Sequence, residues 1–225
     1  MPRTSSKYIE FQTLKDRGKS SITIVKLMMV CNDLSLANEA LIELTKDQSG
    51  SRKQREIGAK IYFVRIQLAH FYEGLKAIEA IREDPFLLSV LKASDEQTQC
   101  SFKNLEQYLK NGSKYDEFEK MVGRVRNDLT FHYDNSGKLI ERDLNDWSTN
   151  HKSQFSIITR GDAPYFWYFK VADDIVDSII VRQIWKISKN ADARVEADKV
   201  LVQLHKIFLS FLDFSGEFIW NYFKN

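Results

Sequence analysis

The chain has 225 residues, of which 33 are Lys or Arg and 31 are Asp or Glu, giving a formal net charge of +2. Charges this evenly balanced exclude a strongly basic nucleic-acid binder, so any contact with RNA must come from a local group of cations. Only three prolines and nine glycines occur, and no Pro/Gly/Ser-rich linker divides the chain, which favours long helices in one domain over residues 1–225.

The cysteine content and the N-terminal sequence both predict a cytoplasmic protein. Cys31 and Cys100 are too few and too unpatterned for a disulfide framework or a zinc site. Residues 1–7 are polar, and no apolar stretch of the signal-peptide type follows them. We therefore expect neither export nor insertion into a membrane.

Two long helices are predicted in the first half of the chain. Apolar residues spaced by three and four indicate a helix over about 21–47 and a second that ends at Asp84-Pro85. The short connection between them predicts an antiparallel pair. The first helix has a stripe of Leu27, Val30, Leu34, Ala37, Leu41 and Leu44. The second has Ile57, Ile61, Val64, Leu68, Phe71, Leu75 and Ile78, widened by Tyr62, Phe63, Ile66 and Tyr72.

Shorter elements are predicted in the rest of the chain. Helices are expected over about 86–93, 96–109, 114–131, 141–147 and 172–188, with a last long helix from about 191. Residues 155–157 and 165–169 are typical of two short strands, which form a hairpin insertion at about 154–169. The expected fold class is therefore all-α, an antiparallel helical bundle with a small β-hairpin insertion.

The segment from Arg126 to Asp134, RNDLTFHYD, carries the strongest functional signal. It places a fixed cation (Arg126), an amide (Asn127) and an imidazole (His132) at the end of a predicted helix, where turn residues follow. A second Arg/His pattern, Arg65 with His70, lies in the middle of a long amphipathic helix. We interpret that second pair as residues of the helix flank or core.

The Arg126-Asn127 pair, the five residues before His132 and the run Phe131-His132-Tyr133-Asp134 resemble the signature of the HEPN superfamily. This resemblance implies a helical bundle that is commonly dimeric and, in many members, a metal-independent endoribonuclease of toxin–antitoxin, phage-defence or RNA-processing systems. It further implies RNA as the substrate, no cofactor, a homodimer, and an antitoxin or nucleotidyltransferase partner. In some toxin members a modified tyrosine stands two positions after the histidine, whereas here Asp134 occupies that position.

The three residue types fit RNA cleavage through the 2′-hydroxyl group. His132 can take up or deliver the protons, Arg126 can hold phosphate oxygens with two donors, and Asn127 can orient a neighbour. The segment supplies one histidine per chain, which is too few for both proton transfers. Six positions on a regular helix turn by about 240°, so Arg126 and His132 would point in different directions. A two-fold dimer that joins two Arg126/His132 sets would meet both difficulties.

A non-catalytic HEPN-like protein that binds nucleotide or a protein partner is the alternative. If the three residues are instead purely structural, Arg126 would pair with Glu119 or Asp128, Asn127 would cap the helix end, and His132 would pack beside Phe131 and Tyr133.

The run Asp173-Asp174-Ile175-Val176-Asp177 indicates a second alternative, the aspartate-rich pattern with which helical isoprenoid synthases hold magnesium and diphosphate. Those enzymes need a second acidic cluster on a facing helix. The nearest candidate, Asn32 to Ser35 with Glu39, is out of register and in the wrong chain order. No His, Cys and carboxylate combination has metal-ligand spacing elsewhere.

Overall fold

The computed structural model describes residues 5–45, 52–130, 136–150, 155–160 and 168–224. Helices dominate this part of the chain, and its only sheet is a two-stranded antiparallel hairpin. The predicted fold class, an all-α bundle with a small hairpin insertion, is therefore confirmed.

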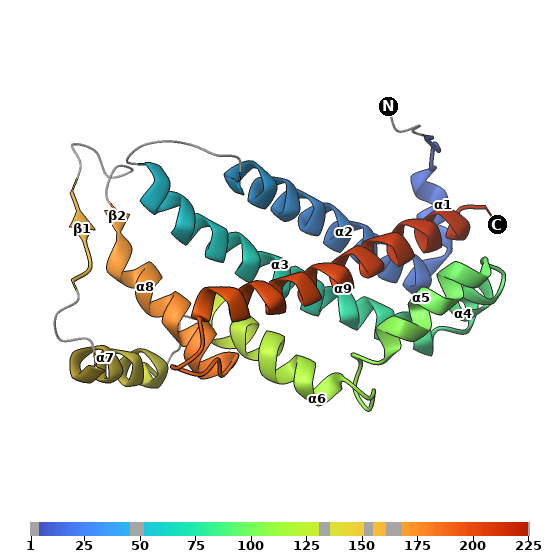
Figure 1. Cartoon of the computed structure of the whole chain (residues 1–225). Helices are drawn as coiled ribbons and strands as arrows, with labels where there is room; N and C mark the ends of the chain where they lie inside the picture. Colours follow the sequence, from blue (N-terminus) through green and yellow to red (C-terminus); the bar gives the residue numbers. More distant parts are fainter. Residues whose placement is uncertain (1–4, 46–51, 131–135, 151–154, 161–167, 225) are drawn as a thin grey trace.

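Three long helices form the body of the molecule: α2 (Gly18–Thr45), α3 (Arg52–Glu83) and α9 (Ala193–Tyr222). Figure 1 shows α2 and α3 as an antiparallel pair, with α9 running across them. The stripes predicted from the three-and-four spacing lie inward, since Leu27, Leu34 and Leu68 are all buried. One hydrophobic cluster contains residues from all three helices, so burial of these stripes holds the bundle together.

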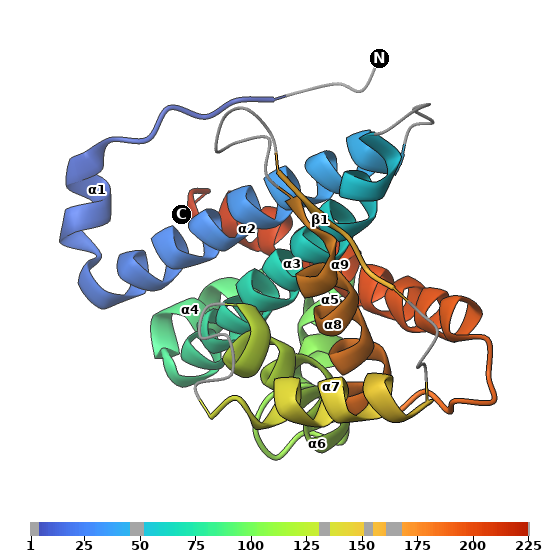
Figure 2. The ribbon, with the colours of Figure 1, turned by 90° about the vertical axis from the view of Figure 1, so that its left-hand side faces the viewer.

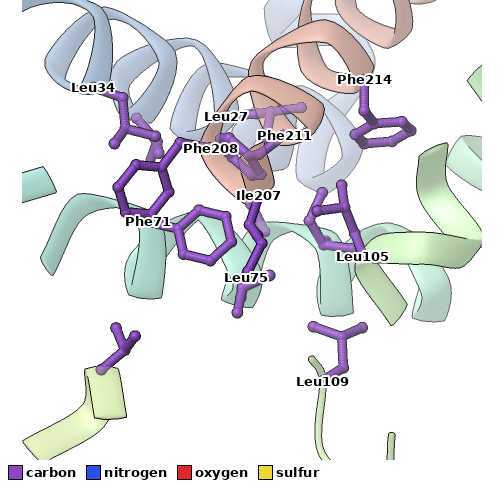
Figure 3. Packing of buried hydrophobic residues seen from close by; sticks show 14 of the residues in the cluster. Leu27, Leu34, Phe71, Leu75, Leu105, Leu109, Ile207, Phe208, Phe211 and Phe214 are labelled. Carbon is purple, nitrogen blue, oxygen red and sulfur yellow. The ribbon is translucent and has the colours of Figure 1, made fainter. Parts of the chain in front are cut away.

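Phe71 lies at the centre of this cluster. Its ring contacts those of Phe118, Phe208 and Phe211 at centroid distances of 5.5, 5.0 and 5.5 Å. Figure 3 shows Phe71 and Leu75 of α3 between leucines of α2 and the aromatic side chains of α9. Gly74 permits this approach, because a Cβ atom there would lie only 2.6 Å from Cζ of Phe211.

The connection after α3 follows the predicted pattern. The Asp84 side chain accepts hydrogen bonds from the backbone N–H groups of Phe86 and Leu87, and Pro85 opens α4 (Pro85–Lys92). Helix α5 (Glu96–Glu106) follows and packs on α9. Two details differ from the prediction. The residues before the first predicted helix contain a short helix, α1 (Phe11–Asp16). Tyr62, which was predicted to widen the apolar stripe of α3, is 48% exposed.

The predicted helix over 114–131 is present but changes its winding. It begins as α6 (Tyr115–Phe118) and continues through two π-helical segments, η1 (Glu119–Gly123) and η2 (Arg126–Thr130). The Thr130 hydroxyl donates to the carbonyl five residues earlier, that of Val125, at 3.0 Å. Because π turns hold more residues than α turns, each residue of η2 turns by less than the roughly 100° of a regular α-helix. Phe118, Val122, Val125 and Leu129 are buried.

The remaining elements lie between η2 and α9 in the chain. They are α7 (Lys138–Asn150), strands β1 (Ile158–Thr159) and β2 (Tyr168–Phe169), α8 (Lys170–Ser178) and a third π-helical segment, η4 (Ile179–Ile184). Ile158 pairs with Phe169 and Thr159 with Tyr168. The first strand was predicted at 155–157 and lies later in the chain. Phe155 is largely exposed, so apolar character there does not reflect a buried strand.

Helix α2 is, within the described ranges, the one helix long and apolar enough to cross a membrane, judged by its length and composition over Gly18–Glu43. Its inner side, including Ile24 and Leu27, lies in the hydrophobic cluster described above. A core helix of a globular protein meets the same criterion, so this finding is weak evidence for a membrane span.

Candidate functional site

Arg126 begins η2 and points toward α3. Its Nη2 donates to Oε1 of Glu73 at 2.9 Å, and its Nη1 donates to Oδ1 of Asn127 at 2.7 Å. The guanidinium also lies over the Tyr72 ring, 5.6 Å from its centroid. The side chain is 29% exposed, so the cation is oriented on three sides and still reaches solvent.

Glu73 is shared between two cations. Lys76 lies one turn after Glu73 on α3 and donates to the same Oε1 atom at 2.8 Å. Burial raises the pKa of Glu73, but the hydrogen bonds and charges of Lys76 and Arg126 outweigh it and lower the pKa overall. Two cations therefore share one ionised carboxylate.

Tyr72 connects this group to η1. Its hydroxyl donates to Oε1 of Glu119 at 3.4 Å. Burial, followed by the charge of Glu119, raises the pKa of Tyr72 to about 12, so the phenol stays neutral near pH 7. The carboxyl of Glu119 lies against Gly123, where a Cβ atom would be 2.3 Å from Oε1. A glycine at position 123 therefore leaves room for the carboxylate that Tyr72 contacts.

Arg65 fixes the other end of η2. This buried side chain donates from Nη1 to the carbonyl oxygen of Leu129 at 2.9 Å, which ties the last turn of the helix to α3. Its charge also lowers the pKa of Asp177 on α8. Arg65 is thus a structural residue of the helix core, as its sequence context predicted.

Asp177 is the most perturbed carboxyl near η2. Burial, followed by the charges of Asp173 and Asp174, raises its pKa to about 7, although Arg65 and Lys170 act in the opposite direction. Its buried Oδ1 has no hydrogen-bond partner within the part of the chain that the structure describes. Protonation of this carboxyl therefore accompanies folding at mildly acidic pH.

We expect Asp177 to make stability fall as pH rises. The folded-state pKa of about 7 lies above the usual carboxyl value, so the stabilising contribution is present in acid and is lost as pH rises through 7. Asp177→Asn stays neutral throughout. Between pH 5 and pH 8, the free energy of unfolding of wild type should fall relative to this variant by about 1–3 kcal/mol. Urea unfolding at four pH values measures it, and parallel profiles would contradict it.

The structure brings together two of the three predicted site residues. Arg126 and Asn127 are hydrogen-bonded to each other, whereas His132, with Tyr133 and Asp134, lies outside the described residues. Neither suggested structural partner of Arg126 pairs with it, since Asp128 contacts Arg124 at 3.7 Å and Glu119 accepts from Tyr72. Asn127 accepts from Arg126 in place of the suggested cap.

The sequence did not identify Tyr72 and Glu73 as neighbours of Arg126. Glu73 lies 53 positions before Arg126 in the chain. One signal was present: Glu73 is an acidic residue beside the wide apolar stripe of α3, where the local pattern gives no reason for a carboxylate. The identity of its partner was not readable from the local pattern.

Three carboxylates of the aspartate-rich alternative are paired with other side chains of the protein. Asp173 accepts a hydrogen bond from Tyr168 at 2.9 Å, and Lys170 holds Asp174. Asp33, from the other proposed acidic cluster, lies 3.3 Å from His70. Across the described ranges, no group of three or more His, Cys, Asp or Glu side chains could hold a metal ion.

A cleft of about 390 Å³ lies between α7 and η4, apart from Arg126. Two of its cations are already engaged: Lys189 pairs with Asp146, and Arg182 donates to the carbonyl oxygen of Ile187 at 3.1 Å and to that of Ser188. The lining residues are Arg142, Asp143, Asn145, Asp146, Thr149, Arg182, Gln183 and Lys189.

Comparison with known proteins adds no family to this geometry. No family model matches the chain, and neither a curated protein nor a solved structure matches it.

Proposed function

We propose that this chain is a HEPN-like, metal-independent endoribonuclease that acts as a homodimer on RNA in the cytoplasm. In this proposal Arg126, Asn127 and His132 form the site, and the activity belongs to a toxin–antitoxin or phage-defence system with an antitoxin or nucleotidyltransferase as partner. The resemblance of the segment from Arg126 to Asp134 supplies the reaction class.

The orientation of Arg126 is the observation that carries the proposal. Glu73, Asn127 and the Tyr72 ring hold the guanidinium at the start of a π-helical segment, and π turns inside helices are frequent at functional sites. A guanidinium held in one direction can meet phosphate oxygens with two donors at little entropic cost. Lys76 is a second cation on Glu73, so part of the Glu73 charge is used outside the pair with Arg126.

Each side chain then has a defined task. His132 takes the proton of the 2′-hydroxyl or protonates the leaving 5′-oxygen, and Arg126 stabilises the charge that develops on the phosphate. Asn127 orients Arg126, the contact that it makes at 2.7 Å. The second proton transfer falls to His132 of the other chain in the dimer.

The test is cleavage of RNA in EDTA by the purified protein and by His132→Ala. Cleavage by wild type and none by the variant supports the proposal. If wild type fails to cleave, or both cleave equally, the enzyme proposal fails. Activity in a chain that stays monomeric at micromolar concentration would contradict the dimer.

One observation favours the non-catalytic alternative. Glu73 already neutralises part of the charge of Arg126, so RNA must compete with an ion pair inside the same chain. A HEPN-like protein that binds a nucleotide or a protein partner would need only this ordered surface. Growth arrest on expression separates the two, because only a nuclease stops growth in a way that His132→Ala relieves.

A further inference from the structure

Helix α2 has an apolar stripe on the side that faces away from the bundle. Met29 is 59% exposed, Leu36 is 66% exposed and Ile22 is 56% exposed, and these three residues are seven positions apart. Val25 lies between Ile22 and Met29, one turn along the same face, and is exposed as well. Seven-residue spacing of apolar side chains is the pattern of a helix that packs lengthwise on another helix.

Charges flank this stripe in an ordered way. Lys19 and Lys26 lie in the N-terminal half of α2, and Asp33, Glu39 and Glu43 lie in the C-terminal half. Lys26 and Asp33 are seven positions apart and so lie on the same flank of the stripe. A second α2 helix running antiparallel would place the basic half of each copy beside the acidic half of the other.

We propose that this face of α2 binds a second copy of the chain in an antiparallel arrangement, with a two-fold axis near Met29. Ile22 and Val25 of each copy then pack against Leu36 of the other, and Lys26 of each lies beside Asp33 of the other. Asn32 is the polar position within the apolar stripe, the kind of residue that fixes register in paired helices.

The α2 face is separate from the proposed RNA site. On α3, Gln67 contacts Asn38 of α2 at 3.4 Å, whereas Arg65 and Glu73 contact η2. At about 100° per residue, the α3 positions that meet α2 and those that meet η2 lie roughly 150° apart. Figure 2 shows α2 above α3, with α6 and α7 below it. A dimer through α2 therefore leaves both Arg126 side chains on its outer sides, so it is a second interface, distinct from the one that the proposed function requires.

The first experiment measures molecular mass by sedimentation equilibrium up to about 100 µM for wild type, Met29→Glu and a matched control. Val202→Glu on α9 is the control, because Val202 is an equally exposed apolar residue, at 56%, of another helix. Met29 lies at the axis, so its substitution brings two carboxylates together and should raise the dissociation constant by at least about ten-fold.

The expected result is a mass that falls by about half in Met29→Glu and is unchanged in Val202→Glu. A monomeric wild type, or equal masses for wild type and Met29→Glu, would overturn the proposal. RNA cleavage is not the readout, so failure of this interface and failure of the nuclease proposal remain distinct.

A charge exchange tests the antiparallel register. Lys26→Glu and Asp33→Lys should each weaken association, and the double variant should restore it, because the exchanged charges again face each other. Additive weakening in the double variant would rule out this register.

An apolar helix face could also bind a membrane. Flotation of the chain with vesicles that contain anionic lipid tests this. The acidic half of α2 should keep the protein in solution, and flotation lost in Met29→Glu would assign the face to a membrane and overturn the proposal.

Discussion

Replacing Arg126 by Ala should lower RNA cleavage by about 100-fold to 1000-fold, the usual cost of removing one group that stabilises charge in a transition state. Arg126→Lys should recover little of this activity. A lysine ammonium is a point charge, so it cannot hold Glu73 and Asn127 together and also present a planar pair of donors to phosphate. Initial rates on a labelled RNA in EDTA, with circular dichroism of each variant, measure the effect.

Arg124→Ala is the matched control for this loss. Arg124 lies two residues earlier on the same helix, is more exposed than Arg126 and pairs with Asp128 within its own helix. It removes one cation without touching Glu73 or Tyr72, so its rate should stay within about three-fold of wild type if general attraction to RNA contributes little. Equal losses in the two variants would mean that charge alone, and not the orientation of Arg126, supports cleavage.

Replacing Phe71 by Ala should lower the free energy of unfolding by about 3–5 kcal/mol. Phe71 is fully buried and meets three rings from two other helices, α6 and α9, so its removal leaves a cavity that no single neighbour can fill. Phe11→Ala on α1 removes an aromatic ring of the same size that is largely exposed, and should change stability by less than about 0.5 kcal/mol. Urea unfolding measures both variants.

A loss below about 1 kcal/mol in Phe71→Ala would show that the rings of Phe118, Phe208 and Phe211 do not depend on it. The central packing described for α3 and α9 would then be wrong. Together, the Phe71 and Arg126 variants separate stability from function, because Arg126 has only a partly exposed ion pair and its loss should cost little stability.

The sequence by itself determined most of the helices and their inner faces. Leu27, Leu34 and Leu68 are buried where three-and-four spacing placed them, because that spacing is a local property of the helix. Asp84-Pro85 marked the end of α3 for an equally local reason, since proline restricts the residue before it and opens the next helix. Arg126 and Asn127 were likewise proposed from adjacent residues, and the structure joins their side chains by a hydrogen bond.

Only the tertiary structure decided which side chains meet across the bundle. Glu73 and Tyr72 become the partners of Arg126 because α3 and η2 pack together, and the sequence offered Glu119 and Asp128 as nearer candidates. The π winding of η2 likewise has no signature in the spacing of its apolar residues. Helix α2 carries two apolar faces, and the bundle buries Leu27 while leaving Met29 outside. Local periodicity records that a face is apolar, whereas burial depends on which helices pack against it.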